Sequence, residues 1–180
     1  YPTPRIHLDC VRLLGPSYFI FREEFIAAAR VPRAILPEAR RILLTIGGGD
    51  PSRLSTKAVR ALGLIFDGRL EVRIIAGPAF TAQGRQEIDD AVAALGRAYS
   101  IVEPGSSLAQ QMLWADLAIT GDGLTKYETA VTGTPSIMLS RAGSERALNE
   151  QFVQAGTVVH VEAETVEISE LAAEIEIVLR

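Results

Sequence analysis

Apolar and polar positions follow two distinct patterns from residue 41 to the end of the chain. Short continuous apolar runs are typical of buried strands, whereas apolar residues that recur every three or four positions indicate amphipathic helices. The short runs predict six strands, at 41–46, 70–76, 99–103, 116–120, 135–139 and 157–161. The helical periodicity predicts six helices, at 55–66, 83–95, 106–114, 124–132, 145–155 and 166–179. Together they predict an α/β fold with a doubly wound, Rossmann-like parallel sheet of six strands.

This fold also predicts where a ligand would bind. In the common strand order 3-2-1-4-5-6, ligands bind at the carboxyl ends of strands one and four, where the chain reverses direction. Glycine-rich turns follow both strands, at Gly47–Asp50 and at Gly121–Gly123. Each turn leads into a predicted helix, whose N-terminal amides attract anionic groups. We therefore expect a phosphorylated ligand between the two turns.

The first forty residues follow a different pattern. A segment with helical character at Arg22–Arg30 precedes a proline-bounded stretch at Val31–Ala39. We interpret residues 1–40 as a connector, the remnant of a missing N-terminal domain, and residues 41–180 as the Rossmann-like domain that binds the ligand. The alternative is an N-terminal arm on a complete protein.

Composition narrows the class of protein. The 180 residues are 48% hydrophobic and 22% charged, as in an ordinary globular α/β domain. The net charge of −4 argues against nucleic acid as a partner. One cysteine and two histidines exclude an internal disulfide and a closed zinc site, and we expect no metal and no cofactor. The sequence has neither a membrane-spanning apolar stretch nor a signal-peptide pattern, so we expect a cytoplasmic protein with no membrane span.

The first glycine turn is not a standard nucleotide motif. It lacks the third glycine of the dinucleotide fingerprint and the Gly-Lys-Ser/Thr ending of an ATP-binding P-loop, which disfavours hydride transfer and classical NTP hydrolysis. Asp50 either faces a ligand or hydrogen-bonds the turn itself, as in an Asx turn.

The second turn continues into a short polar motif, GDGLTKYE at 121–128. Thr125 and Glu128 have the spacing of a capping box, in which Glu128 bonds back to the amide of the N-cap residue. Alternatively, Glu128 faces the crevice and accepts both hydroxyls of a ribose diol. Further along, Arg141 and Arg146 either clamp a phosphate or are solvated surface residues.

The residues that follow this turn carry a family resemblance. Segment 121–139 resembles the carboxyl-terminal nucleotide-sugar motif of the GT-B glycosyltransferase superfamily, in which Gly-Gly, Thr and Glu are followed by Gly-x-Pro and a hydrophobic strand. Here the last part of the pattern is Gly133 and Pro135. Segments 15–25 and 42–51 are similar to the UDP-sugar hydrolases of pseudaminic acid biosynthesis and to glycosyltransferase-like proteins of spore-coat polysaccharide biosynthesis. The resemblance covers the chain from about Leu14 onward.

The resemblance implies a role for each part of the crevice. Glu128 would bind the ribose, the second turn and Thr125 the diphosphate, the first turn the phosphate side, residues 102–103 the base, and Asn149 with Gln151 the sugar or phosphates. The implied nucleotide-sugar-binding residues are Gly47, Gly48, Gly49, Asp50, Val102, Glu103, Gly121, Asp122, Gly123, Thr125, Glu128, Asn149 and Gln151. The catalytic base would belong to the missing N-terminal domain, so no catalytic residue is assigned in this chain.

Two positions depart from the family pattern. Asp122 replaces the second glycine of the usual pair, which places a carboxylate near the expected phosphates. Glu150 separates Asn149 from Gln151, so their side chains would diverge by about 200° on a helix.

The resemblance implies the donor-nucleotide-binding domain of a GT-B-like enzyme, a UDP-sugar hydrolase or glycosyltransferase of surface polysaccharide or nonulosonic acid biosynthesis. Its partners would be UDP or a UDP-sugar and its own missing N-terminal domain, and we expect this part alone to bind without turnover. The alternative is a non-catalytic interaction or scaffold domain, whose crevice would be filled by its own side chains. A sugar-phosphate epimerase of the same superfamily is a third interpretation, which is less favoured because the connector matches the hydrolase family better.

Overall fold

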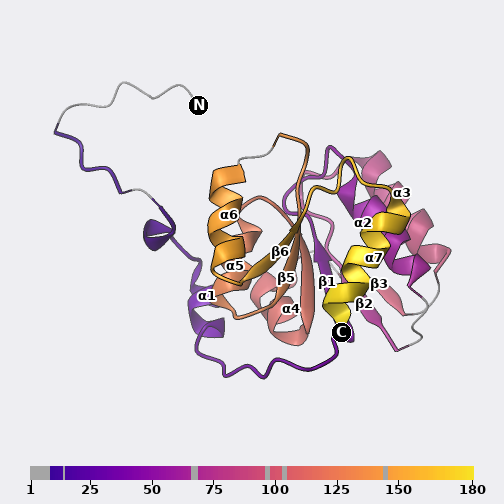
Figure 1. Cartoon of the computed structure of the whole chain (residues 1–180), viewed down its shortest axis with the longest axis horizontal. Coiled ribbons are helices and arrows are strands. Elements are labelled where there is room, and N and C mark those ends of the chain that lie inside the picture. The colour runs from indigo at the N-terminus through magenta and orange to yellow at the C-terminus, as the bar shows by residue number, and fades with distance from the viewer. Residues whose placement is uncertain (1–8, 14, 66–68, 96–97, 103–104, 144–145) are drawn as a thin grey trace.

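The computed structural model describes residues 9–13, 15–65, 69–95, 98–102, 105–143 and 146–180 (Figure 1). These residues form a six-stranded, fully parallel sheet in the order β3-β2-β1-β4-β5-β6, which confirms the predicted fold class and strand order. The strands are β1 (Arg41–Thr45), β2 (Glu71–Ile74), β3 (Tyr99–Ile101), β4 (Leu117–Gly121), β5 (Ser136–Leu139) and β6 (Val158–Val161). The sequence reverses direction in the sheet between β1 and β4, as expected.

Helices cover both faces of the sheet (Figure 1). The helices are α1 (Glu23–Ala28), α2 (Leu54–Leu64), α3 (Ala82–Ala93), α4 (Leu108–Trp114), α5 (Thr125–Val131), α6 (Arg146–Gln154) and α7 (Ile168–Leu179). A single 3₁₀ turn, η1 (Pro16–Tyr18), precedes α1. Each of the six helices predicted after position 41 is present, and α1 lies within the helical segment expected in the connector.

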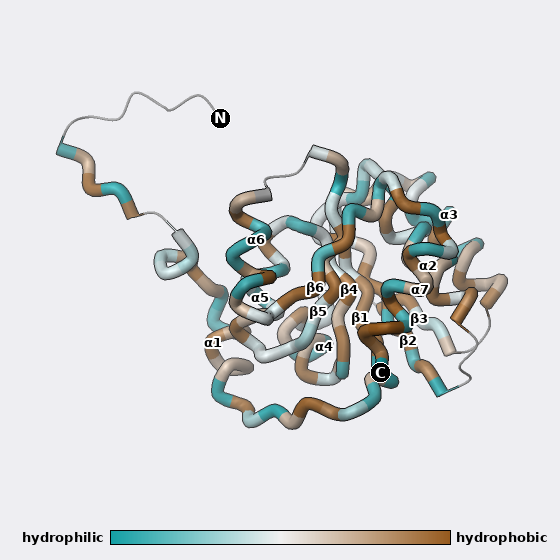
Figure 2. The backbone as a smooth tube through the Cα atoms, in the orientation of Figure 1, coloured by the Kyte–Doolittle hydropathy of each residue, from teal (hydrophilic) through white to brown (hydrophobic). Residues whose placement is uncertain are grey.

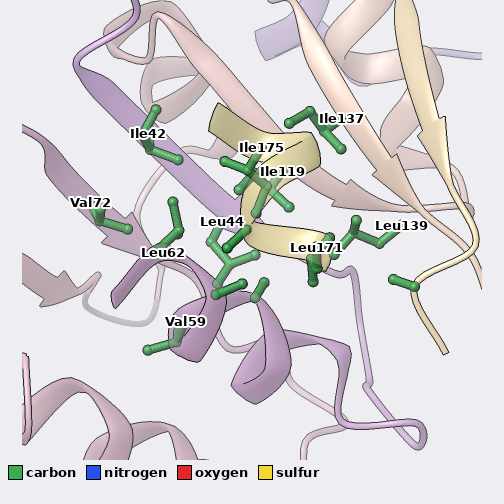
Figure 3. Close-up of a cluster of buried hydrophobic side chains, with 14 of the residues drawn as sticks. Ile42, Leu44, Val59, Leu62, Val72, Ile119, Ile137, Leu139, Leu171 and Ile175 are labelled. Atoms are coloured by element: carbon green, nitrogen blue, oxygen red, sulfur yellow. The ribbon is translucent and has the colours of Figure 1, made fainter. Parts of the chain in front are cut away.

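Alternation along β1 explains the two layers of core. Ile42 and Leu44 point to the face covered by α2 and α7, whereas Leu43 points to the face covered by α1 and α4. All three side chains are fully buried, as expected for a parallel strand covered on both sides. Figure 2 shows the hydrophobic strands at the centre of the body. Figure 3 shows the layer of core between the sheet and helices α2 and α7, where strand residues pack against Val59, Leu62, Leu171 and Ile175.

The segment before β1 is held against the body on the α4 and α5 side. Phe25 is fully buried there, and the Phe19 ring stacks on Tyr127 with 4.2 Å between centroids. The Arg33 guanidinium donates to the Met112 carbonyl at 3.0 Å and to Thr134 Oγ1 at 3.2 Å. The segment before β1 therefore contacts the α/β body through Phe19, Phe25 and Arg33, while most of its other side chains are exposed.

No helix within the described ranges combines the length and apolarity that crossing a bilayer requires.

Candidate functional site

A cleft of about 580 Å³ lies at the carboxyl edge of the sheet. Both predicted glycine turns line it, together with the loops that follow β2 and β5 and one residue of the connector. The lining residues discussed below are Arg22, Gly47, Gly48, Gly49, Asp50, Ile75, Gly77, Pro78, Leu108, Gly121, Asp122, Gly123, Thr125, Glu128 and Arg141. The cleft lies at the switch point of the sheet, where ligands of doubly wound folds bind.

Glycines let the main chain approach itself closely beneath this cleft. A Cβ atom added at Gly121 would lie 2.4 Å from the Ile46 carbonyl oxygen, and one added at Gly77 would lie 2.2 Å from the Gly47 carbonyl oxygen. Gly47 itself has a φ of 114°, which side chains other than glycine rarely adopt. At these glycines the main chain therefore packs directly against the main chain beneath the cleft.

Asp50 binds the start of α2. Its carboxylate accepts hydrogen bonds from the Leu54 amide at 2.8 Å and from the Ser55 amide at 2.6 Å. Asp50 was expected either to face a ligand or to hydrogen-bond the turn, and the structure shows its carboxylate bonded to the main chain that follows the turn. The expectation of bare amides at this helix end is wrong for these two groups, because a carboxylate of the chain already satisfies them.

Glu128 lies in the first turn of α5 and faces the cleft. The helix begins at Thr125 without a side-chain cap, so the capping-box interpretation is wrong. Instead, Glu128 Oε1 lies 3.4 Å from Nη2 of Arg22, and the Glu128 side chain is 15% exposed. Burial raises the pKa of Glu128 above its ordinary value, and the nearby Arg22 charge partly offsets this shift.

Beneath the second turn, a buried lysine joins the turn to α6. Lys126 Nζ donates to the Asp122 carbonyl at 2.8 Å and to Asn149 Oδ1 at 2.7 Å. Asn149 is 2% exposed, and its Nδ2 has no hydrogen-bond partner among the described residues. Gln151 is exposed, so the two side chains lie in different environments, as their spacing predicted. Neither of them is among the residues that line the cleft.

The structure describes only part of the predicted base site at residues 102–103 and of the predicted phosphate clamp formed by Arg141 and Arg146. The Val102 amide donates to the Ile74 carbonyl at 2.9 Å, extending the pairing of β3, and Val102 is not among the cleft-lining residues. Glu103 and the Arg146 side chain lie outside the described residues. Arg141 lines the cleft beyond β5.

Sequence reasoning missed several cleft residues. Arg22 comes from the connector, Leu108 from the start of α4, and Ile75, Gly77 and Pro78 from the loop after β2. The strand order carried the signal for that loop, since β2 pairs with β1 and their carboxyl ends share one sheet edge. For Arg22 the signal was its place in segment 15–25, which carried part of the family resemblance.

Comparisons with known proteins support this picture. No family model matches the chain. It is 27% identical over 151 residues to an uncharacterized protein of Methanocaldococcus jannaschii, covering 82% of this chain and 31% of that protein. It is 28% identical over 148 residues to the spore coat polysaccharide biosynthesis protein SpsG of Bacillus subtilis, covering 81% of this chain and 42% of that protein. The chain therefore spans less than half the length of both relatives.

A solved structure shares the fold. The crystal structure of UDP-GlcNAc 2-epimerase from Neisseria meningitidis bound to UDP-GlcNAc matches with a TM-score of 0.56 and 20% identity. The match covers 79% of this chain and 36% of the epimerase. Taken together, the comparisons confirm the predicted fold and the resemblance: the chain shares the fold of the epimerase and is similar in sequence to the spore coat polysaccharide biosynthesis protein SpsG.

Proposed function

We propose that the cleft binds UDP or a UDP-sugar, and that the chain is the donor-nucleotide-binding domain of a UDP-sugar hydrolase or glycosyltransferase of surface polysaccharide or nonulosonic acid biosynthesis. The observation that carries the proposal is the meeting of Glu128 and the two glycine turns around one cleft. The name of the SpsG relative and the UDP-GlcNAc bound to the epimerase point to the same chemistry.

Glu128 suits a ribose. A carboxylate offers several acceptor lone pairs, and the two adjacent hydroxyls of a ribose present two donors at close spacing. Because the side chain is only 15% exposed, water competes weakly for these hydrogen bonds, which are stronger in a low dielectric. A diol bound here would also replace part of the hydration that Glu128 loses on folding.

The glycine turns suit a diphosphate. Both turns, Gly47–Gly49 and Gly121–Gly123, line the same cleft as Glu128. Without side chains, glycine backbone allows phosphate oxygens to approach main-chain N–H groups closely. We place the diphosphate between these turns and the sugar toward a second domain, which would supply the catalytic base.

The size of the cleft favours this proposal over the scaffold alternative. A domain that had lost its nucleotide site would fill the crevice with its own side chains. A volume of about 580 Å³ instead falls within the range of small-molecule sites. Neither Asp122 nor the separated Asn149 and Gln151 closes it.

The test is calorimetric titration of UDP, CDP, GDP and a UDP-amino sugar into the wild-type chain, Glu128→Gln and Glu174→Gln. Glu174 is an exposed residue of α7 outside the cleft lining and provides a matched control. We expect saturable UDP binding that weakens by roughly 1–3 kcal/mol in Glu128→Gln, since a polar partner is lost. The control variant should bind like wild type. Absence of UDP binding, or an equal loss in both variants, would overturn the proposal.

A further inference from the structure

Arg22 places a connector side chain at the nucleotide cleft. Its Nη1 lies 2.7 Å from Glu24 Oε1, and its Nη2 lies 3.4 Å from Glu128 Oε1. The side chain is 61% exposed. Because the side chain is largely solvated and lies 3.4 Å from Glu128, their contact is weak enough to be exchanged when each group gains a better partner.

The backbone around Arg22 is well anchored. Phe19 stacks on Tyr127, the residue before Glu128. Glu24 accepts a hydrogen bond from Ser107 Oγ at 2.5 Å, and Phe25 is fully buried. The position of Arg22 beside the cleft is therefore set by packing on both sides of it. Its side chain is 61% exposed and its guanidinium also lies over the Phe25 ring, 4.9 Å from the centroid, so a new partner must compete with Glu24, Phe25 and Glu128.

The charges of the cleft leave a diphosphate short of cations. Asp50, Asp122 and Glu128 are acidic, and Asp50 already occupies the first amides of α2. Among the described residues that line the cleft, the cationic side chains are those of Arg22 and Arg141. A bound diphosphate carries at least two negative charges, and arginine pairs with phosphate through two parallel hydrogen bonds.

We propose that Arg22 is a diphosphate-binding residue that exchanges Glu128 for the ligand. This inference rests on the proposed function. In the structure Arg22 partly offsets the effect of burial on the Glu128 carboxylate. When nucleotide binds, the guanidinium turns to the diphosphate and releases Glu128 to accept the ribose hydroxyls. A nucleoside without phosphates must compete with Arg22 for Glu128, whereas a nucleoside diphosphate gives Arg22 a better partner.

The experiment compares UDP with uridine, by calorimetry and by NMR titration, in the wild-type chain, Arg22→Met and Arg30→Met. Arg30 is an exposed connector residue outside the cleft lining, so its variant makes the same charge change elsewhere. We expect Arg22→Met to bind UDP about tenfold or more weakly, since charge-assisted hydrogen bonds are lost. Uridine affinity should stay equal or rise up to about fivefold, as a weak surface pair is removed. Arg22→Lys should recover part of the UDP affinity.

Several results would overturn the exchange. Equal losses for UDP and uridine would make Arg22 a structural residue, and tighter UDP binding would make it a competitor only. If Glu128→Gln weakens UDP binding and Arg22→Met does not, the proposed function stands and this inference fails. If the wild-type chain does not bind UDP, both fail. If the wild-type chain binds UDP but shows no measurable uridine binding, the test is UDP affinity alone. Weaker UDP binding in Arg22→Met but not in Arg30→Met then supports the exchange, and any other result overturns it.

Discussion

At the scale of single residues, Glu128 combines burial with a weakly held partner. The Glu128 side chain is 15% exposed. The Arg22 side chain, whose Nη2 lies 3.4 Å from Glu128 Oε1, is largely solvated. Burial raises the pKa of Glu128, and the Arg22 charge offsets only part of that rise. A carboxylate in this condition gains from any ligand that donates hydrogen bonds to it.

Uridine binding should therefore depend on pH through Glu128. The ionised form accepts both ribose hydroxyls, whereas the protonated form gives up part of this capacity. Affinity should be highest above the raised pKa of Glu128 and fall as pH decreases through it. The fall should begin at a higher pH than an ordinary glutamate gives. NMR titration across the acidic range measures it, with uridine chosen because it has no phosphate to titrate. Glu128→Gln should lose this dependence, and a flat wild-type profile would contradict the prediction.

At the scale of elements, most of the architecture could be predicted from the sequence. The strands and helices after position 41 follow from the local periodicity of apolar residues. The strand order follows from the order 3-2-1-4-5-6 that doubly wound sheets commonly adopt. The cap on α2 and the partner of Glu128 could not be fixed in this way. Asp50 had two chemically reasonable roles, and Arg22 lies 106 positions from Glu128, so a tertiary contact replaced the predicted capping box.

The close approach of β4 to the loop after β1 predicts a sharp difference between two glycines of one turn. Gly121→Ala would place a methyl group 2.4 Å from the Ile46 carbonyl oxygen, whereas Gly123→Ala meets no atom within 4 Å. We expect Gly121→Ala to lose about 1–3 kcal/mol of unfolding free energy, since the backbone must shift to admit the methyl group. Urea denaturation of both variants checks this. Equal stabilities would show that the contact relaxes without cost.

At the scale of the whole molecule, the connector and the α/β body share one set of contacts. Arg33 reaches from the connector to the Met112 and Ala115 carbonyls and to Thr134. Burial lowers the pKa of Arg33 from its ordinary value. These contacts join the segment before β1 to the carboxyl end of α4 and to the loop before β5.

Arg33→Met should therefore destabilise the chain by about 1–3 kcal/mol, because the Ala115 carbonyl loses its Arg33 donor and the Met112 carbonyl is left with the Thr134 hydroxyl. Arg30→Met is the matched control and should change stability little, since Arg30 is exposed. Urea denaturation gives the free energies, and limited proteolysis shows whether the connector becomes accessible first. A control variant that is as unstable as Arg33→Met would contradict the argument.

The main-chain contacts beneath the cleft have a consequence for how this protein can diverge. Gly77 lies against the Gly47 carbonyl and Gly121 against the Ile46 carbonyl, so the spacing of these loops is set by main-chain contacts. Substitutions of lining side chains outside these contacts, such as Leu108, leave the main-chain contacts in place. Ligand preference can therefore drift at the rim across generations while the geometry that would receive the phosphates is inherited unchanged.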